Sequence, residues 1–341
     1  MRTKDGHFTV LIALIVILMT SGALVSDGQY LSLFNLQSMA GQVPEIGLLA
    51  IGVMLAMSVG NGGIELSGIA LANLSGVVAA TVAACFVSAS GEPATFSLIF
   101  ILAALTVGLL GGLLNGLLIA YLKITAILCT LGTQMFFIGL AVVLSDGRSV
   151  RVGAPAPLYD IGNGYLFEVP VSFLLFISVA CFIGFVLRYT PFGLWLMMTG
   201  SNPKASEYAG FPKHKVIVAT YTVSGILSSL AGIIIASRTI NVKWDYGTSY
   251  LLVAILIAVM AGVRPEGGYG RVVCVVLSAI TLQLMSSMLN FMELSNFVRD
   301  FAWGALLLGF LAIGRFRLID FFSPQVRAVS SSVQSPQAQK Q

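Results

Sequence analysis

Charged side chains are scarce in this chain, and that scarcity decides its class. Asp, Glu, Lys and Arg supply 9% of the 341 residues, whereas hydrophobic residues supply 57%. Soluble domains carry about 25% charged residues, which build their polar surface. Because too few polar residues remain for such a surface, we predict an all-α, polytopic integral membrane protein surrounded by membrane lipid. The net charge of +4 is too small to indicate a nucleic-acid partner.

Residue patterns for catalysis and metal binding are lacking as well. Each of the four cysteines stands alone in an apolar stretch, without a CxxC pair or metal-ligand spacing. The two histidines, His7 and His214, lie far apart in the sequence. No G-x-x-x-x-G-K-[ST] phosphate-binding loop occurs. We therefore predict no catalytic residue, no metal, no cofactor and no enzyme activity, including no ATPase activity.

Long apolar runs are what the chain has instead. A helix rises about 1.5 Å per residue, so roughly 20 apolar residues cross the hydrocarbon core of a membrane. We predict a single transmembrane domain, residues 1–322, followed by a disordered cytoplasmic tail rich in Ser and Gln, residues 323–341. The hydropathy pattern places about ten spans at residues 8–25, 46–59, 67–88, 97–121, 124–144, 170–187, 215–237, 249–263, 272–289 and 298–314.

The basic residues favour one face of the membrane. If the N-terminus is cytoplasmic and every predicted span crosses, 13 of the 18 Lys and Arg residues fall on the cytoplasmic side. Cytoplasmic loops of membrane proteins carry an excess of Lys and Arg. We therefore expect both termini to face the cytoplasm, together with a polar loop at residues 199–215.

This polar loop is predicted to contain a short helix. Ser201 or Asn202 can cap the first turn, and Pro203 suits the first helical position, where its missing N–H is harmless. Gly210 can end the helix in a left-handed conformation. The chain thereby gains a compact polar element outside the lipid.

One face of this short helix is small enough to enter a groove on a partner. Ala205, Tyr208 and Ala209 occupy neighbouring positions, and Tyr208 supplies the aromatic anchor that often dominates contact energy. We predict that the loop docks on a partner through a coupling site, which consists of Gly200, Asn202, Ala205, Tyr208, Ala209 and Gly210.

The second predicted span is short and ends in a glycine cluster, and the residues before it, about 26–45, are expected to form an outer loop. Glycines allow close backbone approach, and broken helices recur along the substrate paths of transporters. Two interpretations of Glu65 stay open: a charge on an ordinary surface turn, or a carboxylate inside the bundle. The glycines could instead form an ordinary turn, and the Asn, Ser, Thr and Gln residues could instead form local hydrogen bonds between helices. The candidate pathway residues are Asn61, Gly62, Gly63, Glu65, Ser67, Asn73, Thr130, Thr133 and Gln134.

Two spans carry small residues at close spacing. Small residues let transmembrane helices pack at short distance. We expect two faces of close helix contact, formed by Gly108, Gly112 and Gly116 in one span and by Gly225, Ser228 and Gly232 in another.

The motifs resemble those of a known family in order and spacing, over about residues 45–315. ATP-binding-cassette permeases for ribose-type monosaccharides, including the ribose, xylose, arabinose and autoinducer-2 importers, carry a GGIDLS segment that resembles Gly62-Gly-Ile-Glu-Leu-Ser67. Their coupling segment resembles Thr190-Pro-Phe-Gly193, Gly200-Ser-Asn202 and Ala209-Gly210. A later glycine-rich loop of theirs is similar to Gly262 through Gly270. Branched-chain amino-acid permeases share parts of this pattern less closely.

The resemblance implies a permease subunit of an importer in a bacterial inner membrane. Such a subunit pairs with a second permease subunit, as a homodimer or a heterodimer, and sits on cytoplasmic ATPase subunits. A periplasmic binding protein hands it a small polar solute, here a monosaccharide or a related sugar or polyol. Two positions depart from the family pattern: Glu65 replaces Asp, and Ala261-Gly262 replaces a double glycine.

The alternative function is an ion-coupled secondary transporter of a small polar solute. Proton coupling requires acidic or basic side chains inside the membrane. The predicted spans contain almost none, apart from Glu65 at the edge of one of them. The sequence therefore favours a permease driven by a separate ATPase.

Overall fold

The computed structural model describes residues 6–60 and 62–315, which fold almost entirely into helices. The tail predicted at residues 323–341 lies outside the described residues. Within these described residues, eight helices are long and apolar enough to cross a membrane: α1 (Gly6–Val25), α2 (Leu33–Ser58), α3 (Gly68–Phe86), α4 (Pro93–Ala120), α5 (Ala126–Ser145), α7 (Val171–Tyr189), α10 (Lys213–Thr239) and α12 (Val272–Phe291). The other helices are η1 (Gln29–Leu31), α6 (Ala156–Asn163), α8 (Pro191–Ser201), α9 (Pro203–Tyr208), α11 (Tyr250–Met260) and α13 (Asn296–Arg315).

Short strands close the loops between these helices. The strand β1 (Val150–Arg151) pairs antiparallel with β4 (Asn241–Val242). A second antiparallel pair joins β2 (Tyr165–Leu166) to β3 (Val169–Pro170). Both pairs are only two residues long on each side, so the helices determine the architecture.

The predicted all-α, polytopic class is confirmed, with corrections to single spans. The span expected at residues 249–263 is the 11-residue helix α11, which is too short to cross a bilayer by itself. The span expected at residues 298–314 lies within the 20-residue helix α13. The prediction of a short second span after an outer loop is wrong, because α2 has 26 residues and starts at Leu33.

Polar side chains in the first half of α2 explain this error. They lower the hydropathy of the segment, yet they find partners inside the bundle. Asn35 donates from Nδ2 to the carbonyl oxygen of Tyr30 at 2.7 Å. Gln283 on α12 donates from Nε2 to Oε1 of Gln42 at 3.1 Å. A helix satisfies its own backbone groups, and with these side-chain bonds the segment can lie at membrane depth.

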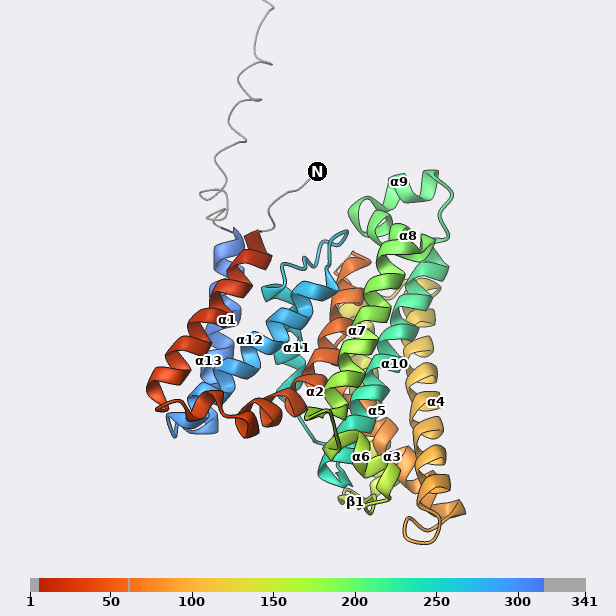
Figure 1. Cartoon of the computed structure of the whole chain (residues 1–341). Coiled ribbons are helices and arrows are strands. Elements are labelled where there is room, and N and C mark those ends of the chain that lie inside the picture. Colours follow the sequence, from red (N-terminus) through yellow and green to blue (C-terminus); the bar gives the residue numbers. More distant parts are fainter. Residues whose placement is uncertain (1–5, 61, 316–341) are drawn as a thin grey trace, which may run out of the picture.

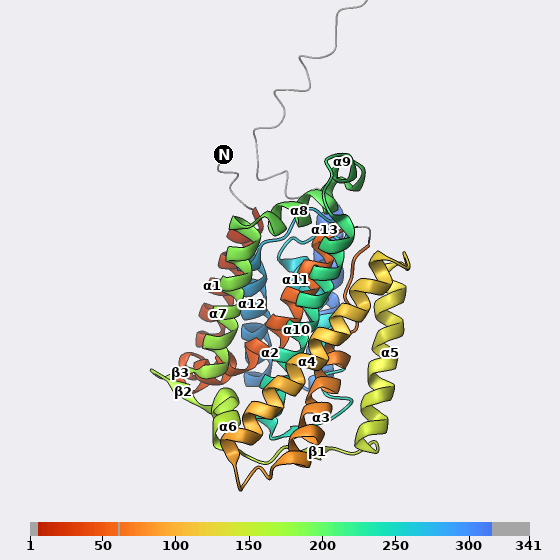
Figure 2. The same cartoon turned by 90° about the vertical axis from the view of Figure 1, so that its right-hand side faces the viewer.

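The helices run between two ends of an elongated bundle (Figure 1). The start of α1, the end of α13 and the helices α8 and α9 lie at one end, called here the α9 end. The helix α6 and the strand β1 lie at the opposite end, the α6 end (Figures 1 and 2). The two ends of the described chain therefore lie on the same side as the predicted coupling site.

The helices α2 and α10 form the centre of the bundle. Every residue of α2 from Val43 to Ser58 is buried. The helix α10 packs against α2, α3 and α4. Outer helices expose large apolar side chains such as Val143 on α5 and Phe301 on α13. Such a surface suits contact with lipid, because apolar side chains need no hydrogen-bond partner there.

The predicted small-residue face of α4 packs against α10 at Gly225, whereas Ser228 and Gly232 of the second predicted face lie against α3. A Cβ atom on Gly225 would lie 2.7 Å from the Cα of Gly112, and one on Gly108 would lie 2.5 Å from the carbonyl oxygen of Gly225. A Cβ on Gly116 would lie 2.8 Å from the Cα of Val218. The prediction of close helix contact is confirmed, because no larger side chain fits between these backbones.

This crossing can be tested by adding volume to it. Gly225→Val forces the backbones of α4 and α10 apart, and we expect the free energy of unfolding to fall by about 1–3 kcal/mol. Thermal unfolding in detergent measures the change. Gly139→Val on α5 is the matched control, because a Cβ there meets no atom within 4 Å. Equal stability of the two variants would contradict the packing described.

Candidate functional site

The short helix predicted in the polar loop is present as α9. Asn202 caps it, since its Oδ1 accepts the N–H of Ala205 at 3.0 Å, and Ser201 ends α8 instead. Pro203 is the first residue of α9. Gly210 has a φ of 73°, so the chain leaves α9 through the left-handed conformation that was predicted.

One side of α9 is fixed to α8, and the other is free. Ser206 is buried, and its Oγ lies 3.1 Å from Oγ1 of Thr199. Tyr208 is 93% exposed, and Ala205 and Ala209 are exposed beside it. The face predicted to dock is therefore available, although docking itself stays a prediction.

Three backbones cross beneath α9 at a point that only glycine permits. We call Gly60, Gly200, Gly267 and Gly268 the glycine junction. A Cβ on Gly60 would lie 2.9 Å from the carbonyl oxygen of Gly200, and one on Gly267 would collide with the Cα of Gly60. The N–H of Gly268 donates to the carbonyl oxygen of Ser58 at 3.0 Å. The ends of α2 and α8 and the loop before α12 are thereby held in backbone contact.

Beyond this junction the chain enters the bundle without helical structure, from Gly62 to Ser67. Gly62 has a φ of 70°. A Cβ on Gly63 would collide with the carbonyl oxygen of Ala56, so the segment turns back tightly against α2. Asn61, the remaining candidate of this segment, lies outside the described residues.

Glu65 lies inside the bundle and is 4% exposed, so the interpretation as a surface turn is wrong. Its Oε1 accepts the N–H of Ser67 at 2.8 Å and the hydroxyl of Ser67 at 2.6 Å. Asn115 on α4 donates from Nδ2 to the Ser67 Oγ at 2.9 Å and to the second Glu65 oxygen at 3.4 Å. Oγ1 of Thr130 on α5 lies 3.0 Å from the carbonyl oxygen of Ile64. We call Glu65, Ser67, Asn115 and Thr130 the Glu65 cluster.

The partners of Glu65 among the described residues are neutral. An acidic side chain in a low-dielectric interior is costly unless it is well hydrogen-bonded, and inside a membrane protein it is a functional candidate. Oδ1 of Asn115 is buried without a partner among the described residues. A cavity of about 10 Å³ beside Glu65, bordered by Ser228 and Tyr250, has room for roughly one water. The cluster thus offers hydrogen bonds and little charge, in a space that is closed to a larger solute.

Three predicted pathway residues lie apart from the Glu65 cluster. Asn73 donates from Nδ2 to the carbonyl oxygens of Trp244 and Tyr246, at 3.1 and 2.9 Å, and so ties α3 to the segment after β4. The hydroxyl of Thr133 bonds within its own helix, and Gln134 is half-buried beside it on α5. Asn73 thus bonds a neighbouring segment, close to the other interpretation, whereas the bond of Thr133 within α5 matches neither interpretation.

Sequence reasoning missed a second buried carboxylate, Glu45 on α2, which is 1% exposed. Its Oε1 lies 2.6 Å from Nη1 of Arg238 at the end of α10. The hydroxyls of Tyr246 and Tyr250 donate to its Oε2 at 3.2 and 3.3 Å. Tyr250 also borders the cavity at Glu65, so this tyrosine connects the surroundings of the two buried carboxylates.

Some sequence signals for the missed residues exist. Glu45 directly precedes one apolar run and Arg238 directly follows another, and these run ends fall on the same predicted side of the membrane. Asn115 interrupts an apolar run four residues after Gly111, on the face of α4 that packs against α3. A polar residue on a tightly packed helix face needs a buried partner.

Comparison with known proteins finds transport permeases in each case that matches. A family model described as "Branched-chain amino acid transport system / permease component" matches residues 35–312. The chain is 29% identical over 300 residues to the ribose import permease protein RbsC of Haemophilus influenzae, which covers 87% of this chain and 89% of the relative. It is also 29% identical over 315 residues to the autoinducer 2 import system permease protein LsrC of Escherichia coli, with 92% and 88% covered. No solved structure matches.

The ion pair between Glu45 and Arg238 gives a test of this site. Removing one partner of a buried pair leaves the other charge uncompensated. We expect Glu45→Gln to lower the free energy of unfolding by roughly 2–4 kcal/mol, less than for a pair with both partners fully buried, because Arg238 is 27% exposed. The double variant Glu45→Gln/Arg238→Gln should be more stable than the sum of the two single effects predicts.

The pair of Lys243 and Asp245, at 3.5 Å, is more exposed than the pair at Glu45 and is the matched control. Lys243→Gln should change stability by about 1 kcal/mol or less, as surface pairs do. Denaturant unfolding of the purified variants measures all four values. A Glu45→Gln variant as stable as Lys243→Gln would show that the buried pair contributes nothing.

Proposed function

The chain belongs to the family of permease components of branched-chain amino acid transport systems, and on that premise we propose that it carries a small polar solute into a bacterial cell. It is the permease component of an ATP-binding-cassette importer and is not itself catalytic. The observation that supports this most is the exposed helix α9, which the glycine junction joins to α2 and to the segment that carries Glu65. A partner that moves α9 would therefore move the residues around a buried polar site.

The proposed solute is a monosaccharide or a related sugar or polyol. The two relatives described above are named for import of ribose and of autoinducer 2. The Glu65 cluster offers hydroxyl and amide groups, which suit a neutral solute with several hydroxyls better than a charged one. We propose that the path includes the segment from Asn61 to Ser67 together with Asn115 and Thr130.

The proposed orientation places the α9 end in the cytoplasm of a bacterial inner membrane. Basic residues of the polar loop and of the loop before α12, such as Lys204, Lys213 and Arg264, lie at this end and favour the cytoplasmic side. Both termini would then be cytoplasmic. Two ATPase subunits would bind at the α9 end, a periplasmic binding protein would dock at the α6 end, and a second permease subunit would complete the channel.

The proposed mechanism follows from these contacts. ATP binding draws the ATPase subunits together, and the docked α9 moves with them. The glycine junction is too tightly packed to absorb this movement, because its atoms already lie at backbone contact distance. The end of α2 and the segment at Glu65 are displaced in turn. The cavity beside Glu65 then opens to one side of the membrane at a time.

One observation bears on the ion-coupled transporter, the alternative that family membership argues against. Glu65 is buried and has no charged partner among the described residues, which is the arrangement of a proton-binding carboxylate in a transporter. The two functions differ in their energy source. Uptake into proteoliposomes that follows an imposed proton gradient, with no ATPase subunit present, would support the ion-coupled transporter over the importer.

The docking face of α9 yields the first functional prediction. Tyr208→Ala removes an anchor side chain, and a hot-spot contribution of about 2 kcal/mol corresponds to roughly a 30-fold loss of affinity. We expect this variant, and Ala205→Glu, to fold and insert normally, to lose the ATPase subunits on purification and to lose uptake. Phe182→Ala on α7, also an exposed aromatic residue but in the middle of its helix, should change none of these properties. Full uptake by both α9 variants would identify α9 as a plain connector.

Glu65 yields the second functional prediction. Hydrogen bonds to a charged acceptor exceed neutral ones by about 1–1.5 kcal/mol, so Glu65→Gln should reduce uptake by about tenfold. Glu65→Asp keeps the carboxylate, and the non-helical segment around it can adjust, so uptake should be retained. Membrane levels of both variants should equal that of the unchanged chain. Normal uptake by Glu65→Gln, measured with labelled sugar in intact cells, would leave Glu65 with a purely structural role.

A further inference from the structure

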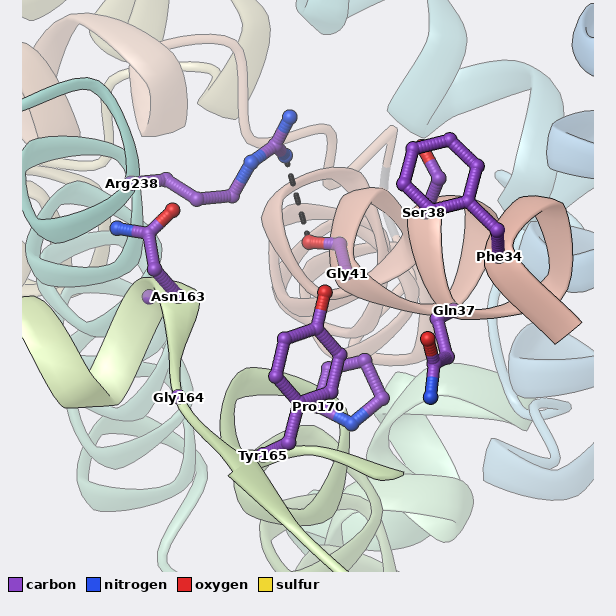
Figure 3. A pocket seen from close by; sticks show the side chains of 10 residues that line it. Phe34, Gln37, Ser38, Gly41, Asn163, Gly164, Tyr165, Pro170 and Arg238 are labelled. Carbon is purple, nitrogen blue, oxygen red and sulfur yellow. Dashed lines mark hydrogen bonds between the residues drawn. The ribbon is translucent and has the colours of Figure 1, made fainter. Parts of the chain in front are cut away.

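A cavity of about 190 Å³ opens at the α6 end of the bundle, far larger than the cavity beside Glu65 (Figure 3). We call it the outer cavity. It lies between the first half of α2, the end of α6, the β2–β3 hairpin and the end of α10. The side chains that the argument uses are Phe34, Gln37, Ser38, Asn163, Tyr165 and Arg238.

Arg238 lines the outer cavity, and hydrogen bonds to α2 hold it in place. Its Nη1 donates to Oε1 of Glu45 at 2.6 Å and to the carbonyl oxygen of Gly41 at 3.3 Å. A guanidinium group has five N–H donors. The contacts described for Arg238 use only Nη1, and its side chain is 27% exposed. Fixed donors therefore remain for a ligand in the cavity.

Two amide side chains present acceptor oxygens to the same space. Asn163 donates from Nδ2 to the carbonyl oxygen of Ser237 at 2.9 Å, which turns its Oδ1 toward the side of Arg238 (Figure 3). Gln37 donates from Nε2 to the carbonyl oxygen of Glu168 at 2.8 Å. This bond fixes the amide group and leaves its Oε1 to accept a hydrogen bond from a ligand. The donors and acceptors of the outer cavity are thus oriented before any ligand arrives.

Two aromatic rings complete the cavity lining. Phe34 is 81% exposed and Tyr165 is 58% exposed, and the two rings come from α2 and from β2. Small-molecule sites combine such apolar surfaces with a few placed polar groups. A sugar ring matches this combination, because its C–H faces are apolar and its rim carries hydroxyl groups.

The charge of the outer cavity decides between classes of solute. Arg238 is the charged residue that lines it, and Glu45 balances that charge. An anion would have to compete with Glu45 for Arg238. A zwitterionic amino acid would need a free carboxylate for its ammonium group, but Glu45 is occupied by Arg238 and two tyrosine hydroxyls. A neutral solute avoids both costs.

We propose that the outer cavity is a binding site for a neutral polyhydroxylated solute. Arg238, Asn163 and Gln37 bind its hydroxyl groups, and Phe34 and Tyr165 pack against its apolar faces. The proposal rests on the proposed function in one respect, namely that the α6 end faces the side from which the solute arrives. A chain of contacts joins the two cavities: Arg238 bonds Glu45, Glu45 bonds Tyr250, and Tyr250 lines the cavity beside Glu65.

Protection of a cysteine in the outer cavity tests this proposal independently of transport. Ser38→Cys is a small change at an exposed position that lines the cavity. It is introduced into a chain whose four natural cysteines are replaced by alanine. The matched control is Ser149→Cys, an exposed serine next to β1 that does not line the cavity. A membrane-impermeant maleimide is applied to right-side-out vesicles that contain the whole chain, with D-ribose as the neutral probe and L-leucine as the zwitterionic one.

We expect saturating D-ribose to slow labelling of Ser38→Cys by at least about tenfold, since an occupied cavity excludes the reagent. L-leucine should not slow it, and neither probe should affect Ser149→Cys. Adding Tyr165→Ala or Asn163→Ala should weaken protection. Uptake of ribose with ATPase subunits present but without protection of Ser38→Cys would overturn the outer-cavity site and leave the proposed function intact. Protection without ATP-dependent uptake would support the site and contradict the proposed function instead.

Discussion

Three segments far apart in the sequence cross at backbone contact distance in the glycine junction, and the arrangement of the bundle at the α9 end depends on that crossing. A Cβ on Gly200 would collide with the carbonyl oxygen of Ser58 and with the backbone nitrogen of Gly268. Because backbones this close cannot slide independently, α8, the end of α2 and the loop before α12 behave as one unit. The exposed α9 is attached to this unit through Thr199 and Ser206.

The polar interior of the protein lies beside α2, whose end this unit holds. A membrane offers no water to polar groups, so each buried one must find a partner or a small cavity. Glu65 finds neutral donors on its own segment and on α4, and Glu45 finds Arg238 and two tyrosines. Both carboxylates border the central helix α2, whose end lies in the glycine junction. In the proposed mechanism, a movement that starts at α9 would reach both sites through α2.

The features predicted correctly from the sequence are those that rest on neighbouring residues. Asn202, Pro203 and Gly210 act within a few residues of themselves, so the start and end of α9 could be predicted from capping rules. The small faces of α4 and α10 were predicted as packing surfaces for the same reason. That Gly225 meets the face on α4 while Ser228 and Gly232 meet α3 is tertiary information that the spacing does not contain.

The features that were missed depend on partners distant in the sequence. Glu45 and Arg238 are separated by 193 positions, and Asn115 lies 50 positions from Glu65. A hydropathy profile counts the polar residues of α2 against a membrane span, because it has no knowledge of the hydrogen bonds that offset their burial. The outer cavity was missed likewise, since α2, α6, β2 and α10 form it together.

The central claim is that a partner acting at α9 opens the space beside Glu65. Ser228 borders that space and is 2% exposed, so Ser228→Cys in a chain without other cysteines reports whether it is closed. The measurement is the rate at which a small thiol reagent labels this cysteine in proteoliposomes that contain the ATPase subunits. The account predicts that the rate differs between nucleotide-free and ATP-bound complexes, and that Tyr208→Ala abolishes the difference. Equal rates in both states, in vesicles that take up sugar, would contradict it.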